Sequence, residues 1–170
     1  MISNATGIRK RFDQNGDFLA QFGTTGTSSP LNTVSSLHLP HGIALDEPLD
    51  VLCVADREAE RIVCFRAGLL EPEVFGKVVS SIPEVHGRRV FDVASIGAGI
   101  MLGVGGSEAE KTSGIAFAAD TSEAYVMSQW RPKQGLHNPH AVAVSPDASS
   151  IYIAEMKPNT VWKFSLRRRY

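Results

Sequence analysis

Hydrophobic and polar residues alternate along this chain in short runs. Valine, isoleucine and leucine alternate with small or polar residues over stretches such as 41–45, 51–55 and 151–154, and clusters of glycine, proline, aspartate or serine bound the runs. Successive side chains of a β-strand point to opposite faces, so this pattern is typical of short strands. No long apolar stripe with the 3.6-residue period of a helix is present. The pattern therefore predicts an all-β chain of short strands joined by turns.

The chain repeats itself at a constant offset. Residues 40–45, PHGIAL, recur as residues 139–144, PHAVAV, and the offset of 99 then holds without a gap to Phe65 and Phe164. This offset is about twice the ~40–50 residues of one four-stranded propeller blade, so a further copy should lie halfway. Residues 90–94, VFDVA, lie 50 residues after the first copy and 49 before the last. We therefore interpret the chain as a β-propeller.

A partial copy precedes these three. Residues 12–23 repeat the length of residues 65–76, from phenylalanine to glycine, and Asn15-Gly16 within them predicts a hairpin with a tight primed turn. At ~50 residues per blade the chain holds about three to four blades, and closed propellers have at least four. The expected architecture is therefore an incomplete β-propeller. Its blade pieces are expected at about 1–39, 40–89, 90–138 and 139–170.

The two cysteines fall opposite each other in one predicted hairpin. Paired positions of an antiparallel hairpin share a constant sum, which pairs Cys53 with Cys64 and leaves 57–60 as the turn. Opposed Cβ atoms lie about 4.5–5.5 Å apart, which allows a disulfide after modest adjustment. A disulfide would indicate an oxidising compartment, and the alternative is two unpaired cysteines in the core. Tyr152 and Lys163 take these positions in the last copy, so the fold does not require the bridge.

Two histidines begin the predicted inner strands of alternate blades. They are His41 and His140, and Phe91 stands at the same position between them. In a six-bladed ring, alternate blades are related by a third of a turn, so a third histidine upstream of this chain would complete a site on the axis. Three neutral imidazoles with an open fourth position are typical of catalytic zinc. The alternative is that both histidines are hydrogen-bonding or packing residues.

Arg57 is the third candidate for chemistry. It follows the second strand of the first full copy, so we expect it at the mouth where the strand of His41 begins. Its planar, permanently charged guanidinium suits a substrate that carries a carboxylate. The alternative is a surface salt bridge with Glu58 or Glu60, which would contribute little.

Charge and composition exclude several partners. Lys and Arg number 17 against 18 Asp and Glu, a net charge of -1, so no broad basic field would attract nucleic acid, and the one basic run is Arg167–Arg169. The longest apolar stretch, 93–104, is shorter than the roughly 20 residues that cross a bilayer, so no membrane span is expected. No basic and then apolar segment follows Met1, so a secretory leader is not expected within the sequence as written. Asn4 begins a glycosylation sequon, a pattern that often occurs by chance.

At these positions the sequence resembles the peptidyl-α-hydroxyglycine α-amidating lyases, the lyase domain of peptidylglycine α-amidating monooxygenase. The resemblance runs from about Ile8 to Leu166. It implies a six-bladed NHL-type β-propeller, of which this chain is a C-terminal fragment. NHL repeats in general share the Gly-Ile-Ala and Val-Ala-Asp pieces, whereas the histidine, the paired cysteines and the Trp-Lys-Phe ending are narrower. The matching segments are LPHGIAL (39–45), LCVADRE (52–58), RIVCF (61–65), GRRVF (87–91) and NTVWKF (159–164).

The resemblance implies an enzyme that cleaves a peptidyl-α-hydroxyglycine into a peptide amide and glyoxylate. His41 and His140 match two of the three zinc-binding histidines, Arg57 matches an active-site arginine, and Cys53 with Cys64 match a disulfide of the family. The third zinc ligand would lie upstream of this chain. The substrate would be a C-terminally α-hydroxyglycine-extended peptide. The enzyme would be fused to a copper monooxygenase or work after one, and it would be secreted or act in the lumen of the secretory pathway.

Three departures from the family leave the activity of this fragment open. Ala141 replaces an aspartate that binds the family's structural calcium, Asn138 replaces a methionine that lines its site, and no tyrosine precedes Tyr125, although the family uses a catalytic tyrosine. The alternative function is therefore a non-catalytic NHL-repeat module that binds a protein or a glycan.

Overall fold

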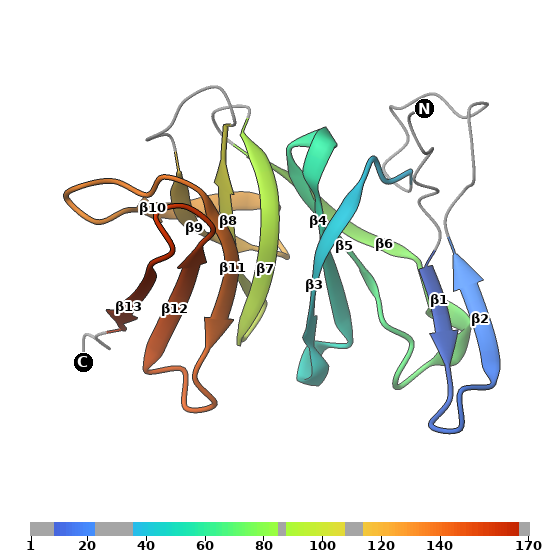
Figure 1. Cartoon of the computed structure of the whole chain (residues 1–170). Coiled ribbons are helices and arrows are strands. Elements are labelled where there is room, and N and C mark those ends of the chain that lie inside the picture. Colours follow the sequence, from blue (N-terminus) through green and yellow to red (C-terminus); the bar gives the residue numbers. More distant parts are fainter. Residues whose placement is uncertain (1–8, 23–35, 85–87, 108–113, 167–170) are drawn as a thin grey trace.

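The computed structural model describes residues 9–22, 36–84, 88–107 and 114–166, so Asn4 and Arg167–Arg169 lie outside the described residues. These ranges contain thirteen β-strands, three single 3-10 turns and no α-helix (Figure 1). The strands are β1 (Arg9–Phe12), β2 (Phe18–Phe22), β3 (Pro40–Asp46), β4 (Val51–Asp56), β5 (Arg61–Arg66), β6 (Val78–Pro83), β7 (Arg89–Gly97), β8 (Ile100–Gly106), β9 (Ile115–Asp120), β10 (Tyr125–Trp130), β11 (Pro139–Val144), β12 (Ser150–Glu155) and β13 (Val161–Ser165); the turns are η1 (Glu47–Leu49), η2 (Arg57–Ala59) and η3 (Pro72–Val74).

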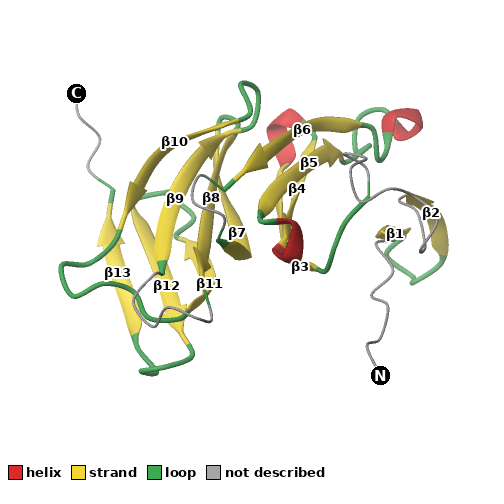
Figure 2. Ribbon diagram, turned by 90° about the horizontal axis from the view of Figure 1, so that it is seen from above, coloured by secondary structure: helices red, strands yellow, loops and turns green. Residues whose placement is uncertain are grey.

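The strands form four antiparallel sheets. Strands β1 and β2 form a hairpin, β3 to β6 and β7 to β10 form four-stranded sheets, and β11 to β13 form a three-stranded sheet. Strand β7 lies between β3 and β11, so the first strands of the three larger sheets stand side by side (Figures 1 and 2). Sheets arranged in this way are the blades of a propeller. The structure thus confirms the predicted all-β, partial propeller.

The repeat arithmetic anticipated which strands are the inner ones. The copies of the repeat begin at residues 40, 90 and 139, and the inner strands begin at Pro40, Arg89 and Pro139, so the two agree to within one residue. The four expected blade pieces and their borders stay a prediction. No helix among the described residues has the length and apolar character needed to cross a membrane.

Neighbouring sheets pack face to face through apolar side chains. One buried cluster joins β4 and β5 to β7, β8 and β9 and includes Ile62 and Phe117, and a second joins β8 and β9 to β11 and β12 and includes Leu102 and Ile153. Each fully buried side chain of this size contributes ~1.5–3 kcal/mol. Gly103 of β8 faces the ring of Phe117, where a Cβ would lie 2.2 Å from Cζ. This position therefore requires glycine, because the ring occupies the space of a side chain.

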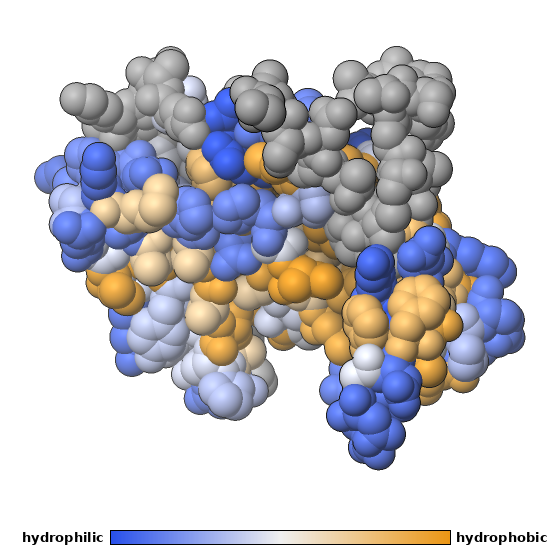
Figure 3. Space-filling view, turned by 45° about the vertical axis from the view of Figure 1, so that its right-hand side comes forward, coloured by the Kyte–Doolittle hydropathy of each residue, from blue (hydrophilic) through white to orange (hydrophobic). Residues whose placement is uncertain are grey.

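Some apolar side chains remain exposed, and hydrophobic areas show on the face in Figure 3. On β3, Ile43 is 59% exposed and Leu45 40%, although β3 is an inner strand. In a closed propeller each inner strand has a neighbour on both sides. Their exposure agrees with a ring that the described residues do not close.

The hairpin of β4 and β5 has the predicted register. Cys53 pairs with Cys64 and Asp56 pairs with Arg61, and the two cysteines form a disulfide that is fully buried. At the equivalent positions of β12 and β13, Tyr152 pairs with Lys163, and the Lys163 Nζ atom lies 5.7 Å from the centroid of the tyrosine ring. Equivalent hairpins thus form with a disulfide, in β4 and β5, and without one, in β12 and β13.

The hairpin of β1 and β2 is confirmed, but its predicted turn type is wrong. A primed turn needs positive φ at both Asn15 and Gly16, whereas only Gly16 has it, at 87°. The Asp13 side chain accepts hydrogen bonds from the backbone N–H groups of Asn15 and Asp17. The Asp13 carboxylate thus satisfies backbone N–H groups of the turn. These bonds favour a turn other than the primed two-residue type.

Replacing both cysteines by alanine should lower the free energy of unfolding by about 2–3 kcal/mol, because the bridge restricts a short loop in the unfolded chain. Urea denaturation of the oxidised protein and of the variant measures this difference. The Tyr152–Lys163 pair indicates that the hairpin itself survives. Equal stability of the two proteins would contradict the expectation.

The turn between β11 and β12 should lose stability in acid. The Ser145 hydroxyl, the Ser149 N–H and the Ser149 hydroxyl all donate to Asp147, and these bonds lower its pKa from 3.8 to about 2. A pKa that is depressed in the folded state stabilises the fold above pH 4, and this contribution is lost as the pH falls toward 2. The stability difference between wild type and Asp147→Asn, measured by urea denaturation, should therefore shrink between pH 4 and pH 2. A constant difference would contradict the assignment.

Candidate functional site

Three aromatic rings meet where the inner strands begin. His41 on β3 and His140 on β11 have ring centroids 4.9 Å apart, although 99 residues separate them in sequence. Phe91 on β7 stacks on His140 at 5.2 Å with an angle of 30° between the planes, and its centroid lies 6.0 Å from that of His41. The middle strand thus contributes a phenylalanine at the position where its neighbours contribute histidines.

The imidazole of His41 is held in one tautomer. Its Nδ1 atom lies 2.6 Å from the carbonyl oxygen of Phe91. A carbonyl oxygen only accepts hydrogen bonds, so Nδ1 carries a proton and Nε2 is the nitrogen that could bind a metal. An imidazole that ligates a metal through one nitrogen usually donates its other N–H to a carbonyl or carboxylate in this way.

His140 is biased toward its neutral form. Burial lowers its pKa below the usual 6.5, repulsion from His41 and Arg57 lowers the pKa further, and Asp92 opposes the shift. The neutral imidazole is the form that binds metals. His140 therefore favours the chemical state of a metal ligand near neutral pH.

Arg57 lies beside this cluster. Its guanidinium carbon stands 5.2 Å from the centroid of the Phe91 ring, and its Nε atom is 3.4 Å from a carboxylate oxygen of Glu58. The other oxygen of Glu58 lies 3.1 Å from Arg89. The salt bridge considered as the alternative is thus present. The guanidinium nevertheless lies next to the histidines, where a carboxylate ligand could reach it.

Two buried carboxylates, which the sequence analysis did not single out, hold the segments that lead into the histidine strands. Asp56 accepts the N–H of His38 and, at 2.9 Å, the Nε–H of Arg61. Glu155, 99 residues later, accepts the N–H of His137 and the indole N–H of Trp162. Both acids are almost completely buried. Their equivalent positions in the repeat were a signal that could have revealed this shared role.

The described residues fit part of a metal site. Within those ranges, no three His, Cys, Asp or Glu side chains gather into a group that could hold an ion. His41 and His140 fit as two imidazole ligands, and a third ligand would have to come from elsewhere. Calcium fits poorly at Ala141, because calcium takes oxygen ligands and alanine offers no side-chain oxygen.

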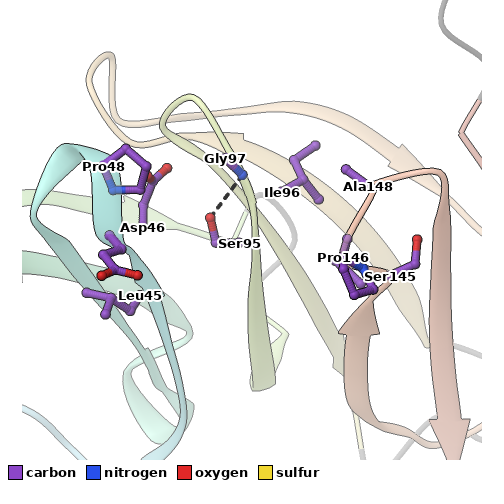
Figure 4. Close-up of a pocket in the computed structure, with 11 residues that line it drawn as sticks. Leu45, Asp46, Pro48, Ser95, Ile96, Gly97, Ser145, Pro146 and Ala148 are labelled. Atoms are coloured by element: carbon purple, nitrogen blue, oxygen red, sulfur yellow. Dashed lines mark hydrogen bonds between the residues drawn. The ribbon is translucent and has the colours of Figure 1, made fainter.

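A pocket of about 360 Å³ lies at the other end of the inner strands (Figure 4). It is lined by the far ends of β3, β7 and β11, including Asp46, Ser95 and Ser145. Asp46 is buried and accepts the N–H of Gly99 at 2.9 Å. His41 is the second residue of β3 and Asp46 is the last, so this pocket is separate from the histidine cluster.

The NHL repeat family matches residues 37–65, and the described sheets are part of an NHL-type β-propeller. Hydrazine synthase of Kuenenia stuttgartiensis has a similar fold, with a TM-score of 0.67 over 94% of this chain and 40% of that one, at 10% sequence identity. A likeness at this identity concerns the fold alone.

The sequence relatives are amidating enzymes. Peptidyl-alpha-hydroxyglycine alpha-amidating lyase 2 of Drosophila melanogaster is 38% identical over 77% of this chain and 32% of its own length. Peptidylglycine alpha-amidating monooxygenase of Rattus norvegicus is 32% identical over 94% of this chain and 16% of its own, and the B form from Xenopus laevis is 31% identical over 91% and 17%. The chain is a relative of the peptidyl-α-hydroxyglycine α-amidating lyases. It spans about a third or less of the length of these relatives.

Replacing Asp56 by alanine should lower the free energy of unfolding by about 3 kcal/mol, because the substitution leaves the N–H of His38 and the side chain of Arg61 without their buried acceptor. Urea denaturation measures the loss. Asp13→Ala is the matched control, since Asp13 also accepts backbone N–H groups but lies in a surface turn, and it should cost much less than Asp56→Ala. Equal losses in the two variants would show that burial of Asp56 adds nothing.

Proposed function

We propose that this chain is part of an enzyme that cleaves a peptidyl-α-hydroxyglycine to a peptide amide and glyoxylate. The names of its relatives support the reaction. The observation that carries the proposal is the cluster of His41, His140 and Arg57, in which two imidazole rings lie 4.9 Å apart beside a guanidinium. That set offers metal ligands next to a group that binds carboxylates.

In this proposal His41, through Nε2, and His140 would hold a zinc ion together with a third ligand from outside the described residues. Bound zinc would supply a Lewis acid that polarises the substrate's oxygen atoms. The carbonyl of Phe91 orients the imidazole of His41, and the low pKa of His140 keeps that ring unprotonated at neutral pH. Calcium is not part of the proposed site.

Arg57 would orient the substrate by pairing with its carboxylate. The reaction then needs one proton transfer and no oxidant. The hydroxyl O–H bond gives up its proton, and its electron pair forms the carbonyl of glyoxylate. The C–N bond breaks, its electron pair stays on the amide nitrogen, and that nitrogen takes the proton. Neither described tyrosine, Tyr125 on β10 or Tyr152 on β12, belongs to the cluster, so the catalytic tyrosine that the family resemblance implies would come from outside the described ranges.

The proposal places the protein in an oxidising compartment such as the lumen of the secretory pathway, with secretion as one outcome. The Cys53–Cys64 disulfide supports this placement. The substrate is a peptide that has already been hydroxylated at its terminal glycine. Several relatives are named monooxygenases, which supports a hydroxylating copper monooxygenase as the supplier, in the same chain or as a partner.

His41→Ala and His140→Ala in the full-length protein should each abolish stoichiometric zinc and lower kcat/KM at least about 100-fold, because each removes a proposed ligand. Metal analysis and glyoxylate release from an α-hydroxyglycine peptide measure the two effects. Arg57→Ala should mainly raise KM, since it removes a carboxylate contact. Arg66→Ala is its control, because Arg66 is exposed at the other end of its hairpin and contacts Leu49.

Two results would contradict the proposal. Zinc that stays bound at full stoichiometry in both histidine variants would exclude these residues as ligands. A wild-type protein that releases no glyoxylate would favour the alternative of a non-catalytic NHL-repeat module that binds a protein or a glycan.

A further inference from the structure

Asp92 lies where the three inner strands come together. It follows Phe91 on β7, and its Oδ2 atom accepts the N–H of Val142 on β11 at 2.9 Å. Its Oδ1 atom accepts the N–H of Val93 at 2.9 Å, which fixes the rotation of the carboxylate. Because Val142 is two residues after His140, this bond ties β11 to β7 close to that histidine.

The other neighbour of Asp92 is Gly42, which directly follows His41 on β3. A Cβ at position 42 would lie 2.1 Å from Asp92 Oδ1 and 2.7 Å from its Cα. Both distances are shorter than any real contact, and one of them involves backbone. Glycine therefore allows β3 to approach β7 at this level, and any side chain would push the two strands apart.

Phe91 of β7 contacts both histidines. Its carbonyl accepts from His41, and its ring stacks on His140. A shift of β7 relative to β3 or β11 would therefore break the contact on that side. The β7 blade, which carries Phe91 in place of a histidine, therefore contacts the histidines of both neighbouring blades.

We propose that Asp92 is a positioning residue that holds His41 and His140 at their separation, by binding β11 through Val142 while Gly42 admits β3. The part of this inference that concerns zinc rests on the proposed function. The part that concerns the distance between the two rings does not.

The test uses the metal-free, full-length protein with protonated histidines in a deuterated background. Nuclear Overhauser contacts between the rings of His41 and His140 are recorded for wild type, Asp92→Asn and Gly42→Ala, and His41→Ala identifies the cross-peaks. Asp92→Asn keeps the side-chain shape but presents only one acceptor oxygen to two N–H groups. Gly42→Ala perturbs the same contact without changing any charge, so one variant remains informative if the other does not fold.

Asp120→Asn is the matched control. Asp120 also accepts backbone N–H groups, from Ser122 and Glu123, but it lies in the exposed turn after β9. Thermal unfolding of every variant shows whether the fold is retained. Zinc affinity is then measured by competition with a chelator.

Asp92→Asn and Gly42→Ala should lose the contact between the rings and weaken zinc binding about tenfold, as loss of an outer contact around metal ligands usually does. Asp120→Asn should change neither quantity. If the rings stay in contact in both variants, or if zinc affinity is unchanged when the contact is lost, Asp92 is not a positioning residue. If wild type binds no zinc while the ring contact still depends on Asp92 and Gly42, the proposed function fails and the structural role of Asp92 stands.

Discussion

The side-by-side packing of β3, β7 and β11 is the constraint on which the rest of the described structure depends. It places residues that lie 50 and 99 positions apart within one cluster of rings. It also sets the directions in which the three sheets extend, and hence which faces bury apolar side chains between them. The core and the candidate site are therefore two results of the same arrangement.

Apolar packing and hydrogen bonds contribute to this arrangement in different ways. Apolar packing between sheets supplies most of the stabilisation, and it is not directional. Hydrogen bonds to Asp56 and Glu155 fix the segments that enter β3 and β11, and the carboxylate of Asp92 fixes β11 against β7. The apolar contacts thus hold the sheets together, while a few buried acceptors determine where the strands begin.

Much of the fold could be predicted because its information is local and repeated. The offset of 99 identified the inner strands, and the pairing of Cys53 with Cys64 followed from the arithmetic of one hairpin. Arithmetic within a repeat says nothing about contacts between blades, so the roles of Phe91 and Asp92 stayed hidden. The turn at Asn15 was mistaken because the side chain of Asp13 competes for the amides.

The candidate site was predicted as a set of residues, and its geometry was not. His41, His140 and Arg57 were chosen from positions in the repeat and from a family resemblance, and the structure brings all three together. Their roles as zinc ligands and substrate contact stay predictions, as do the blade borders and the sequon at Asn4. What the sequence could not show is that Arg57 and Arg89 share one acid, Glu58, because that contact joins two blades.

The hydrogen bond from His41 to the carbonyl of Phe91 has a consequence for how this site tolerates substitution. The acceptor belongs to the backbone, so every amino acid at position 91 would present the same oxygen. The tautomer of His41 is therefore encoded by the alignment of two strands and not by the chemistry of a neighbouring side chain. Mutations at position 91 can change the ring that stacks on His140 and still leave the hydrogen bond of His41 Nδ1 intact.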